Sequence, residues 1–398
     1  VDYGSNVGAW SSYDASRIAI LQDIGDQIWA NYPEAILILE HFADNTEEVE
    51  LSDYGFLLWG NMNHNYNEAT MGFNDGNKSD LSGGFYRNRN WSDPHLVTYM
   101  ESHDEERLMY KNLEFGNRQG SYTVRDLNTA LDRVEMANTF FWTIPGPKMI
   151  WQFGELGYDF PINYCIGDGT IEEECRTGRK PIRWQYYRVP ERRDLYDYVS
   201  DLTYLKRTFS ETFRDANPRM DLNGPVKRIE LAGPELVLQA IGNFAVESRS
   251  LTTQFSTDGT WYDYVSGDSI VVSGGSYAFD LEPGAHAIWL SQKIERPSVA
   301  DVATATGFVA PALQDFSVFP NPARGGQDLY IRWSGLNDQS FHLSVVNGQG
   351  QTVWQRQLER VLDGVDIELP QMPTGLYYLQ LRRANGQLLG VEKLLIRR

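Results

Sequence analysis

The sequence has few cysteines, no long apolar run, and too few basic residues to balance its acids. Among 398 residues, 35 are Lys or Arg and 54 are Asp or Glu, so the formal net charge is -19 at pH 7. Nucleic acid and anionic membrane surfaces repel such a chain at long range, and neither is expected as a partner. No apolar run reaches the roughly 18 residues of a membrane-spanning helix, so no membrane insertion is predicted. The charge balance favours a soluble protein with a neutral ligand.

Only two cysteines occur, Cys165 and Cys175, and they bracket an acidic loop within the stretch 164–180. A pair this close in an otherwise cysteine-free chain is compatible with a small disulfide-closed loop made in an oxidising compartment. The alternative is two free thiols. The chain opens on Val1 with neither an initiator Met nor a signal segment, so further residues are expected upstream.

The chain is long and rich in aromatic residues. A chain of 398 residues exceeds one ordinary core, which predicts two or three domains. Aromatic residues make up 13%, with 11 Trp and 22 Tyr. Such rings suit a protein that stacks against sugar faces, but they also fill β-rich cores.

Residues 1–215 alternate short apolar runs with amphipathic helical patterns, which is typical of a parallel α/β architecture. The run 35–39 is expected to be a strand buried on both faces, and the polar stretch 61–93 is expected to be a long functional loop. Because a helix comes first, we expect the last four strands of a (β/α)8 TIM barrel. The apolar runs are 35–39, 55–60, 95–100 and 147–153, and the helical patterns are 15–32, 127–141 and 191–213.

From about residue 216 the pattern changes to short alternating runs separated by Gly-rich turns. Residues 216–293 are predicted to form an antiparallel β-sandwich. A linker is predicted at 294–315, where Ala, Thr, Val and Pro dominate. A second β-sandwich module is predicted at 316–398. The fold class is therefore α/β followed by all-β.

Acidic side chains follow two of the apolar runs. Glu40 ends the first run, and the pair His103-Asp104 follows the third. Since the carboxyl ends of barrel strands share one rim, these groups are expected to face one substrate. Glycoside cleavage uses two carboxylates in this way, and a carboxyl leaving a hydrophobic strand suits the acid role. Position alone leaves open that Glu40 caps a helix and that Asp104 belongs to a salt-bridged loop.

Three motifs resemble those of the α-amylase family, glycoside hydrolase family 13. They are the segment 36–45 around Glu40, the segment 101–104, and the segment 145–155 with its Pro-Gly-Pro start. The resemblance covers about the first 293 residues and includes a C-terminal β-domain. It implies a retaining hydrolase of starch-like α-glucans, with Glu40 as general acid/base. It also implies that Asp104 and His103 bind the distorted sugar. His41 and Phe42 follow the acid directly and are candidates to line the aglycone side; the alternative for Phe42 is packing beneath its loop.

One departure from the family concerns the nucleophile. The family carries a nucleophilic Asp in a Gly-Phe-Arg-x-Asp pattern one strand earlier, and no such pattern precedes Glu40. We therefore expect the nucleophile upstream of Val1 and an inactive chain without it. Calcium often binds in this family, but its ligands are mostly expected upstream too, and no metal cluster stands out here. A non-catalytic glucan-binding surface protein is the alternative, and hydrolysis cannot be separated from transglycosylation.

Other aromatic and imidazole side chains have less specific interpretations. Trp59 and Trp91 are candidate sugar-stacking platforms. Trp151 is a weaker candidate, because it is expected inside a strand and in the core. His64 and His95 are interpreted as structural.

The last module resembles the C-terminal sorting domain of type IX secretion substrates. The resemblance rests on the segments 316–323, 343–350, 373–379 and 393–398. It implies the type IX export machinery as a partner, and a secreted or cell-surface location reached through the outer membrane. The alternative is an ordinary carbohydrate-binding or Ig-like β-module.

Overall fold

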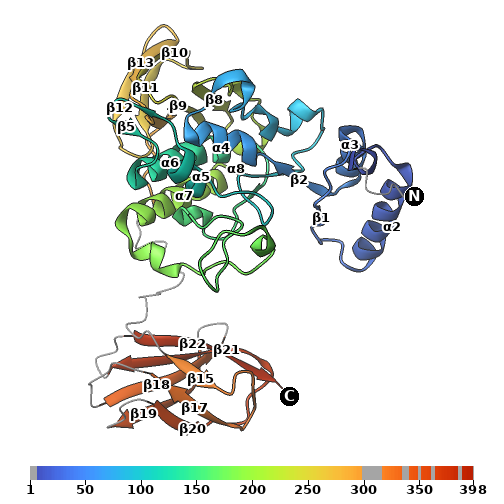
Figure 1. Cartoon of the computed structure of the whole chain (residues 1–398), viewed down its shortest axis with the longest axis vertical. Coiled ribbons are helices and arrows are strands. Elements are labelled where there is room, and N and C mark those ends of the chain that lie inside the picture. The colour runs from blue at the N-terminus through green and yellow to red at the C-terminus, as the bar shows by residue number, and fades with distance from the viewer. Residues whose placement is uncertain are drawn as a thin grey trace. The chain divides into compact units, whose positions relative to one another are not determined.

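The computed structural model describes six stretches of the chain and divides into two compact units, Val1–Pro297 and Ser298–Arg398. Figure 1 shows the chain coloured from the N-terminus in blue to the C-terminus in red. Most of the linker expected at 294–315 lies outside the described residues. The described residues are 7–297, 316–333, 340–347, 351–359, 364–383 and 388–397.

The first unit begins with a parallel sheet whose strand order is β1-β2-β3-β6. All three pairings are parallel, and each strand lies beside its neighbour in the chain order expected of alternating strands and helices. The carboxyl ends of the strands therefore meet at one edge. The strands are β1 (Ile38–Leu39), β2 (Leu57–Asn61), β3 (Leu96–Tyr99) and β6 (Lys148–Met149).

The expectation that the run 35–39 is buried on both faces is wrong. Only Ile38 and Leu39 form β1, and Ile36 and Ile38 are 73% and 49% exposed. Within the described residues β1 pairs with β2 alone, so its other edge has no neighbour to cover it.

The helices follow the patterns expected of them where the sequence is strongly periodic. Asp14 caps α2 by accepting hydrogen bonds from the amides of Ser16 and Arg17, and Asp126 caps α6 in the same way. The stretch 61–93 is not one long loop, because it holds α4 and three short 3-10 helices. The α-helices are α1 (Val7–Trp10), α2 (Ala15–Asn31), α3 (Asn45–Tyr54), α4 (Asn63–Met71), α5 (Leu108–Phe115), α6 (Leu127–Thr143), α7 (Pro190–Thr208) and α8 (Ser210–Asp215).

An antiparallel six-stranded sheet of order β12-β11-β14-β9-β8-β7 completes the first unit, with β10 and β13 paired beside it. Two further short strands, β4 (Arg118–Gln119) and β5 (Tyr122–Thr123), form a separate hairpin. The strands are β7 (Arg219–Asp221), β8 (Val226–Ala232), β9 (Val237–Asn243), β10 (Arg249–Gln254), β11 (Gly259–Asp263), β12 (Ser269–Val272), β13 (Ser276–Leu281) and β14 (His286–Leu290).

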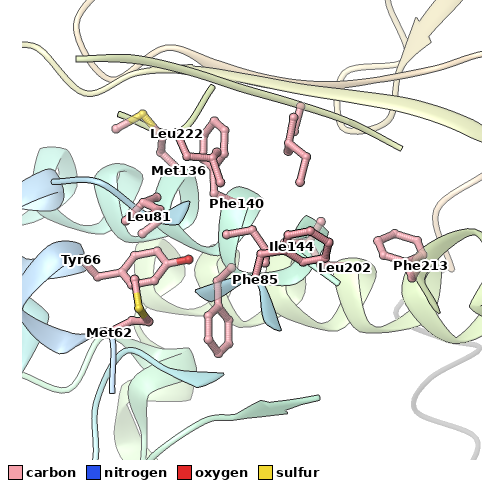
Figure 2. Close-up of a cluster of buried hydrophobic side chains, with 14 of the residues drawn as sticks. Met62, Tyr66, Leu81, Phe85, Met136, Phe140, Ile144, Leu202, Phe213 and Leu222 are labelled. Carbon is pink, nitrogen blue, oxygen red and sulfur yellow. The ribbon is translucent and has the colours of Figure 1, made fainter. Parts of the chain in front are cut away.

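One hydrophobic core joins the helices to this second sheet. Helix α6 contributes Phe140, whose ring lies 5.5 Å from that of Phe244 beyond β9. Figure 2 shows Met136 and Phe140 on this helix, and Ile144 just after it, among side chains from several other elements. This core contains residues from both sides of position 216. The domain boundary expected between residues 215 and 216 therefore stays a prediction.

The described residues of the second unit form two β-sheets with a separate core. The sheets have the orders β15-β17-β20 and β16-β22-β21-β18-β19. Their strands are β15 (Ser317–Phe319), β16 (Ala323–Arg324), β17 (Asp328–Arg332), β18 (Ser340–Asn347), β19 (Thr352–Glu359), β20 (Gly364–Glu368), β21 (Gly375–Arg383) and β22 (Leu388–Arg397).

Candidate active site

Glu40, His103 and Asp104 lie together at the carboxyl edge of the parallel sheet. Glu40 follows β1 and the other two follow β3, yet one ligand atom from each lies within 4.8 Å of the others. His103 Nε2 is 3.6 Å from Glu40 Oε1 and 3.4 Å from Asp104 Oδ2. The Glu40 side chain is 40% exposed, so it does not occupy the hydrophobic setting expected from its strand. All three groups are open to a ligand from solvent.

Two tryptophans from the remaining strands flank His103. The Trp59 ring from β2 lies 5.8 Å from the imidazole, and the Trp151 ring just after β6 lies 5.9 Å from it. Trp151 is half-buried and follows its short strand, so its expected place inside a strand is wrong. Trp91 is only 2% exposed and donates to Asn45, which makes it a core residue. Each of the four strands thus places a side chain at this cluster.

A carboxylate that the sequence analysis did not single out supports the segment carrying His103. Glu105 Oε1 accepts hydrogen bonds from Asn61 Nδ2 at 2.6 Å and from Tyr99 Oη at 3.3 Å. Its other oxygen accepts from Ser102 Oγ. These donors come from the ends of two neighbouring strands, so Glu105 ties the loop after β3 to β2 and β3.

Glu101 occupies the buried side of the same loop. Its carboxylate accepts a 2.7 Å hydrogen bond from the amide of Leu108 in the first turn of α5. Burial raises the pKa of Glu101 to about 6, although the nearby Arg107 guanidinium favours the charged form. Glu101 therefore anchors the loop to a helix and is too enclosed to meet a substrate.

A disulfide joins Cys165 and Cys175 in the long segment before α7. Arg176, next to this disulfide, donates a hydrogen bond from Nη2 to the backbone carbonyl of Asp104. The disulfide-closed segment thus contacts the candidate site directly. Neither the spacing of the cysteines nor any motif pointed to this contact.

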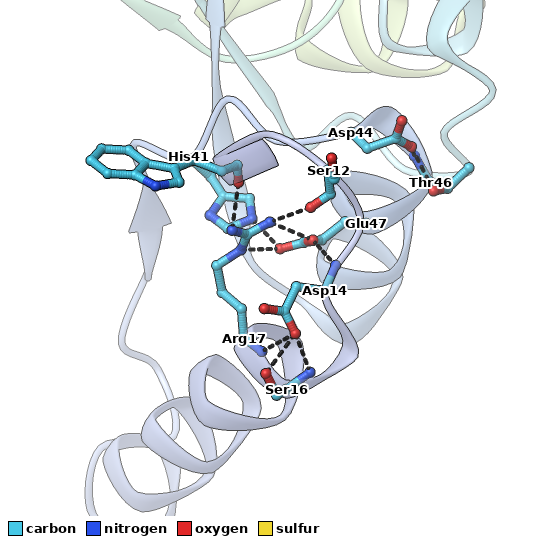
Figure 3. Close-up of polar contacts among 9 residues, drawn as sticks. Ser12, Asp14, Ser16, Arg17, His41, Asp44, Thr46 and Glu47 are labelled. Carbon is cyan, nitrogen blue, oxygen red and sulfur yellow. Dashed lines mark hydrogen bonds and ion pairs between the residues drawn. The ribbon is translucent and has the colours of Figure 1, made fainter. Parts of the chain in front are cut away.

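His41 has a different environment from Glu40, although the two are adjacent in sequence. Its Nε2 lies 2.6 Å from Glu47 Oε1, and its side chain is 10% exposed. Glu47, whose side chain is fully buried, also accepts from Arg17 at 2.7 and 2.8 Å and from the amide of Asp14 at 2.9 Å (Figure 3). In this position the imidazole fixes the chain just after Glu40, and its expected contact with substrate stays a prediction.

The Glu47 cluster yields a pH-dependent prediction. Burial disfavours the charged carboxylate, but hydrogen bonds from Arg17, the Asp14 amide and His41 outweigh it and hold the pKa of Glu47 below its usual value. Stability from such a group is present above the unfolded-state pKa and is lost as pH falls through the folded-state pKa. We expect Glu47→Gln to lower the free energy of unfolding by about 1–3 kcal/mol at pH 7. The loss should shrink at about pH 3, as measured by urea unfolding.

The matched control is Glu50→Gln, in the same helix but exposed. We expect it to change stability by less than about 0.5 kcal/mol at either pH. An equal loss for Glu47→Gln at both pH values would contradict the assignment of a charged Glu47.

The remaining candidates fall into two groups. Phe42 is 43% exposed and has a φ of 43°, a strained value for a side chain of this size, so it is not packed beneath its loop. Its substrate contact stays a prediction. His95 Nδ1 lies 2.9 Å from the carbonyl of Ser52, which fits a structural role, whereas His64 is exposed.

Among the described residues, the cluster of Glu40, His103 and Asp104 is the one group of three or more His, Cys, Asp or Glu side chains with a metal-like spacing. Calcium takes six to eight oxygen ligands, and this group offers two carboxylates and an imidazole. These residues do not fit a calcium site.

Solved structures resemble the first unit in fold. AmyP in complex with maltose is 14% identical with a TM-score of 0.51, over 71% of this chain and 69% of that chain. The α-amylase from Geobacillus thermoleovorans complexed with acarbose is 13% identical with a TM-score of 0.51, over 71% and 60%. CldA, a cyclomaltodextrin glucanotransferase, is 15% identical with a TM-score of 0.51, over 71% and 56%. At these identities the likeness establishes the fold alone, and the chain spans less than two thirds of the last two proteins.

None of the described helices has the length and apolar character needed to span a bilayer.

Sequence comparison identifies the family of the second unit. The whole chain matches no curated protein in sequence. Residues 317–397 match the family described as "Secretion system C-terminal sorting domain". These residues therefore form a type IX sorting domain, which directs the protein through the outer membrane to the cell surface or the medium.

Proposed function

We propose that this chain is the C-terminal part of a retaining α-glucan hydrolase of the α-amylase type. The observation that supports this most is the meeting of Glu40, His103 and Asp104 at the carboxyl edge of a parallel sheet. Parallel barrels place their catalytic groups at this edge. The fold neighbours include an α-amylase and a glucanotransferase, and AmyP was solved with maltose bound.

In this mechanism Glu40 transfers protons, and Asp104 and His103 bind the sugar. Glu40 donates a proton to the glycosidic oxygen as the bond breaks, and later takes a proton from the attacking water. Asp104 and His103 hydrogen-bond sugar hydroxyls and stabilise the oxocarbenium-like transition state. The rings of Trp59 and Trp151, both next to His103, offer apolar surface to the sugar.

A nucleophile is the part of this mechanism that the cluster lacks. A retaining enzyme forms a glycosyl-enzyme through a carboxylate about 5–5.5 Å from the acid. We assign this role to an Asp upstream of Val1, on strands that complete an eight-stranded barrel. The exposed Ile36 and Ile38 at β1, and Ile20 and Ile24 on α2, provide the apolar surface that such strands and helices would cover. The domains are then a half-barrel to residue 215, a β-sandwich to 293, a linker to 315 and the sorting domain.

The experiment extends the chain by its upstream coding sequence and incubates the protein with starch and with maltotriose. Reducing ends are measured, and NMR follows the anomer that forms first. We expect cleavage with retention as the α-anomer, and no cleavage by residues 1–398 alone. Binding of glucan without cleavage by the extended protein would favour the non-catalytic alternative, and an inverted first product would reject the retaining mechanism.

A further inference from the structure

The segment before α7 contains an exposed tryptophan, Trp184, at the start of the 3-10 helix Trp184–Arg188. Trp184 is 70% exposed, and Ile182, two residues earlier, is 64% exposed. Large apolar side chains that are exposed to solvent close to one another are typical of a binding surface. These two residues follow the loop closed by the Cys165–Cys175 disulfide.

This segment is attached to the loop of the candidate site at two points. Arg176 donates to the backbone carbonyl of Asp104. The amide of Ile162 donates a 2.9 Å hydrogen bond to the carboxylate of Glu106, two residues after Asp104. The segment therefore lies against the loop that carries Asp104.

The Trp184 ring is also held in place. It packs edge to face on Phe153, with ring centroids 4.8 Å apart and an interplanar angle of 82°. Phe153 is itself buried, with a left-handed φ of 59°, and it follows Trp151 by two residues. Trp151 lies 5.9 Å from His103, so the short segment 151–153 contacts both the candidate site and Trp184. The preceding residue, Arg183, is held as well, because its guanidinium carbon lies 4.4 Å from the centroid of the Phe160 ring.

From these contacts between the segment before α7 and the candidate site, we propose that Trp184 is a stacking platform for α-glucan units. These units extend beyond those held at Glu40, His103 and Asp104. A ring fixed before binding loses little entropy when a sugar stacks on it. The platform makes the site selective for longer oligosaccharides over short ones. This inference rests on the proposed function, because it requires a glucan at the catalytic cluster.

The test compares maltotriose and maltoheptaose binding to the extended protein by isothermal titration calorimetry. We expect Trp184→Ala to weaken maltoheptaose binding about tenfold, which corresponds to about 1.4 kcal/mol, because the sugar loses an aromatic surface to stack on. Maltotriose affinity should stay unchanged. Trp184→Phe should restore most of the loss. The control is Tyr32→Ala, also 70% exposed but next to the C-terminus of α2, before β1 begins.

The outcomes separate the two hypotheses. If the parent protein binds both glucans and Trp184→Ala binds them equally well, the platform is rejected and the proposed function stands. If Trp184→Ala weakens both glucans alike, the ring belongs to the central site and length selectivity is rejected. If the parent protein binds neither glucan, the platform and the proposed function both fail.

Discussion

Replacing Glu40 by Gln is expected to lower the rate of starch cleavage by the extended protein about 10²- to 10⁴-fold. The amide cannot donate a proton to the leaving oxygen, while its size and shape leave the contacts near His103 in place. Initial rates of reducing-end release measure the effect. Binding of maltotriose should change little, because Glu40 acts in the transition state more than in the bound ground state.

Two further measurements make this prediction specific. A maltoside with a dinitrophenolate leaving group needs little protonation, so Glu40→Gln should retain much more of the rate on it. Glu34→Gln, which changes an exposed carboxylate before β1, should have no effect on either substrate. Full activity of Glu40→Gln on starch would remove Glu40 from the acid role.

Replacing Arg133 by Met is expected to lower the free energy of unfolding of the first unit by about 3–5 kcal/mol. Arg133 is fully buried in α6. Its guanidinium donates to the carbonyls of Ala69 at 3.0 Å and Thr70 at the end of α4, and to those of Phe244 at 2.7 Å and Ala245 at 3.3 Å. Met fills a similar volume but removes the guanidinium donor from all four carbonyls. The carbonyls of Ala69 and Phe244 each keep one other donor, the amide of Gly72 and Asn74 Nδ2.

Urea unfolding followed by tryptophan fluorescence measures this loss. The matched control is Arg125→Met, because Arg125 donates to the carbonyl of Gly116 but is itself exposed. We expect that control to cost less than about 1 kcal/mol. A loss of similar size in both variants would contradict the role of Arg133 as a buried link between α4 and the chain after β9.

The parts of the fold that the sequence predicted well are those governed by local periodicity and capping. Helices α2 and α6 begin at an Asp that accepts backbone amides and continue with regularly spaced apolar residues. By contrast, α4 was missed because its sequence is mostly polar. Asn63 and Asn67 are buried in it and bonded to each other, and this tertiary environment compensates for weak local propensity.

In the candidate site, too, some contacts were predictable from the sequence and others were not. The approach of Glu40 to His103 and Asp104 was predictable, because parallel neighbouring strands end at one edge. The contact of Arg176 with Asp104 was not predictable, since it joins residues 72 positions apart through a loop without regular structure. The pairing of His41 with Glu47, which Arg17 also contacts, likewise depends on how α2 and α3 pack.

The sequence by itself determined which strands run in parallel, which carboxylates end them, and that a sorting domain closes the chain, because these features depend on local pattern and motif. Only the tertiary structure decided which aromatic rings face the site, where the disulfide-closed segment lies, and which charged side chains are buried as links. Those properties arise from contacts between residues distant in the chain, and no local pattern encodes such contacts.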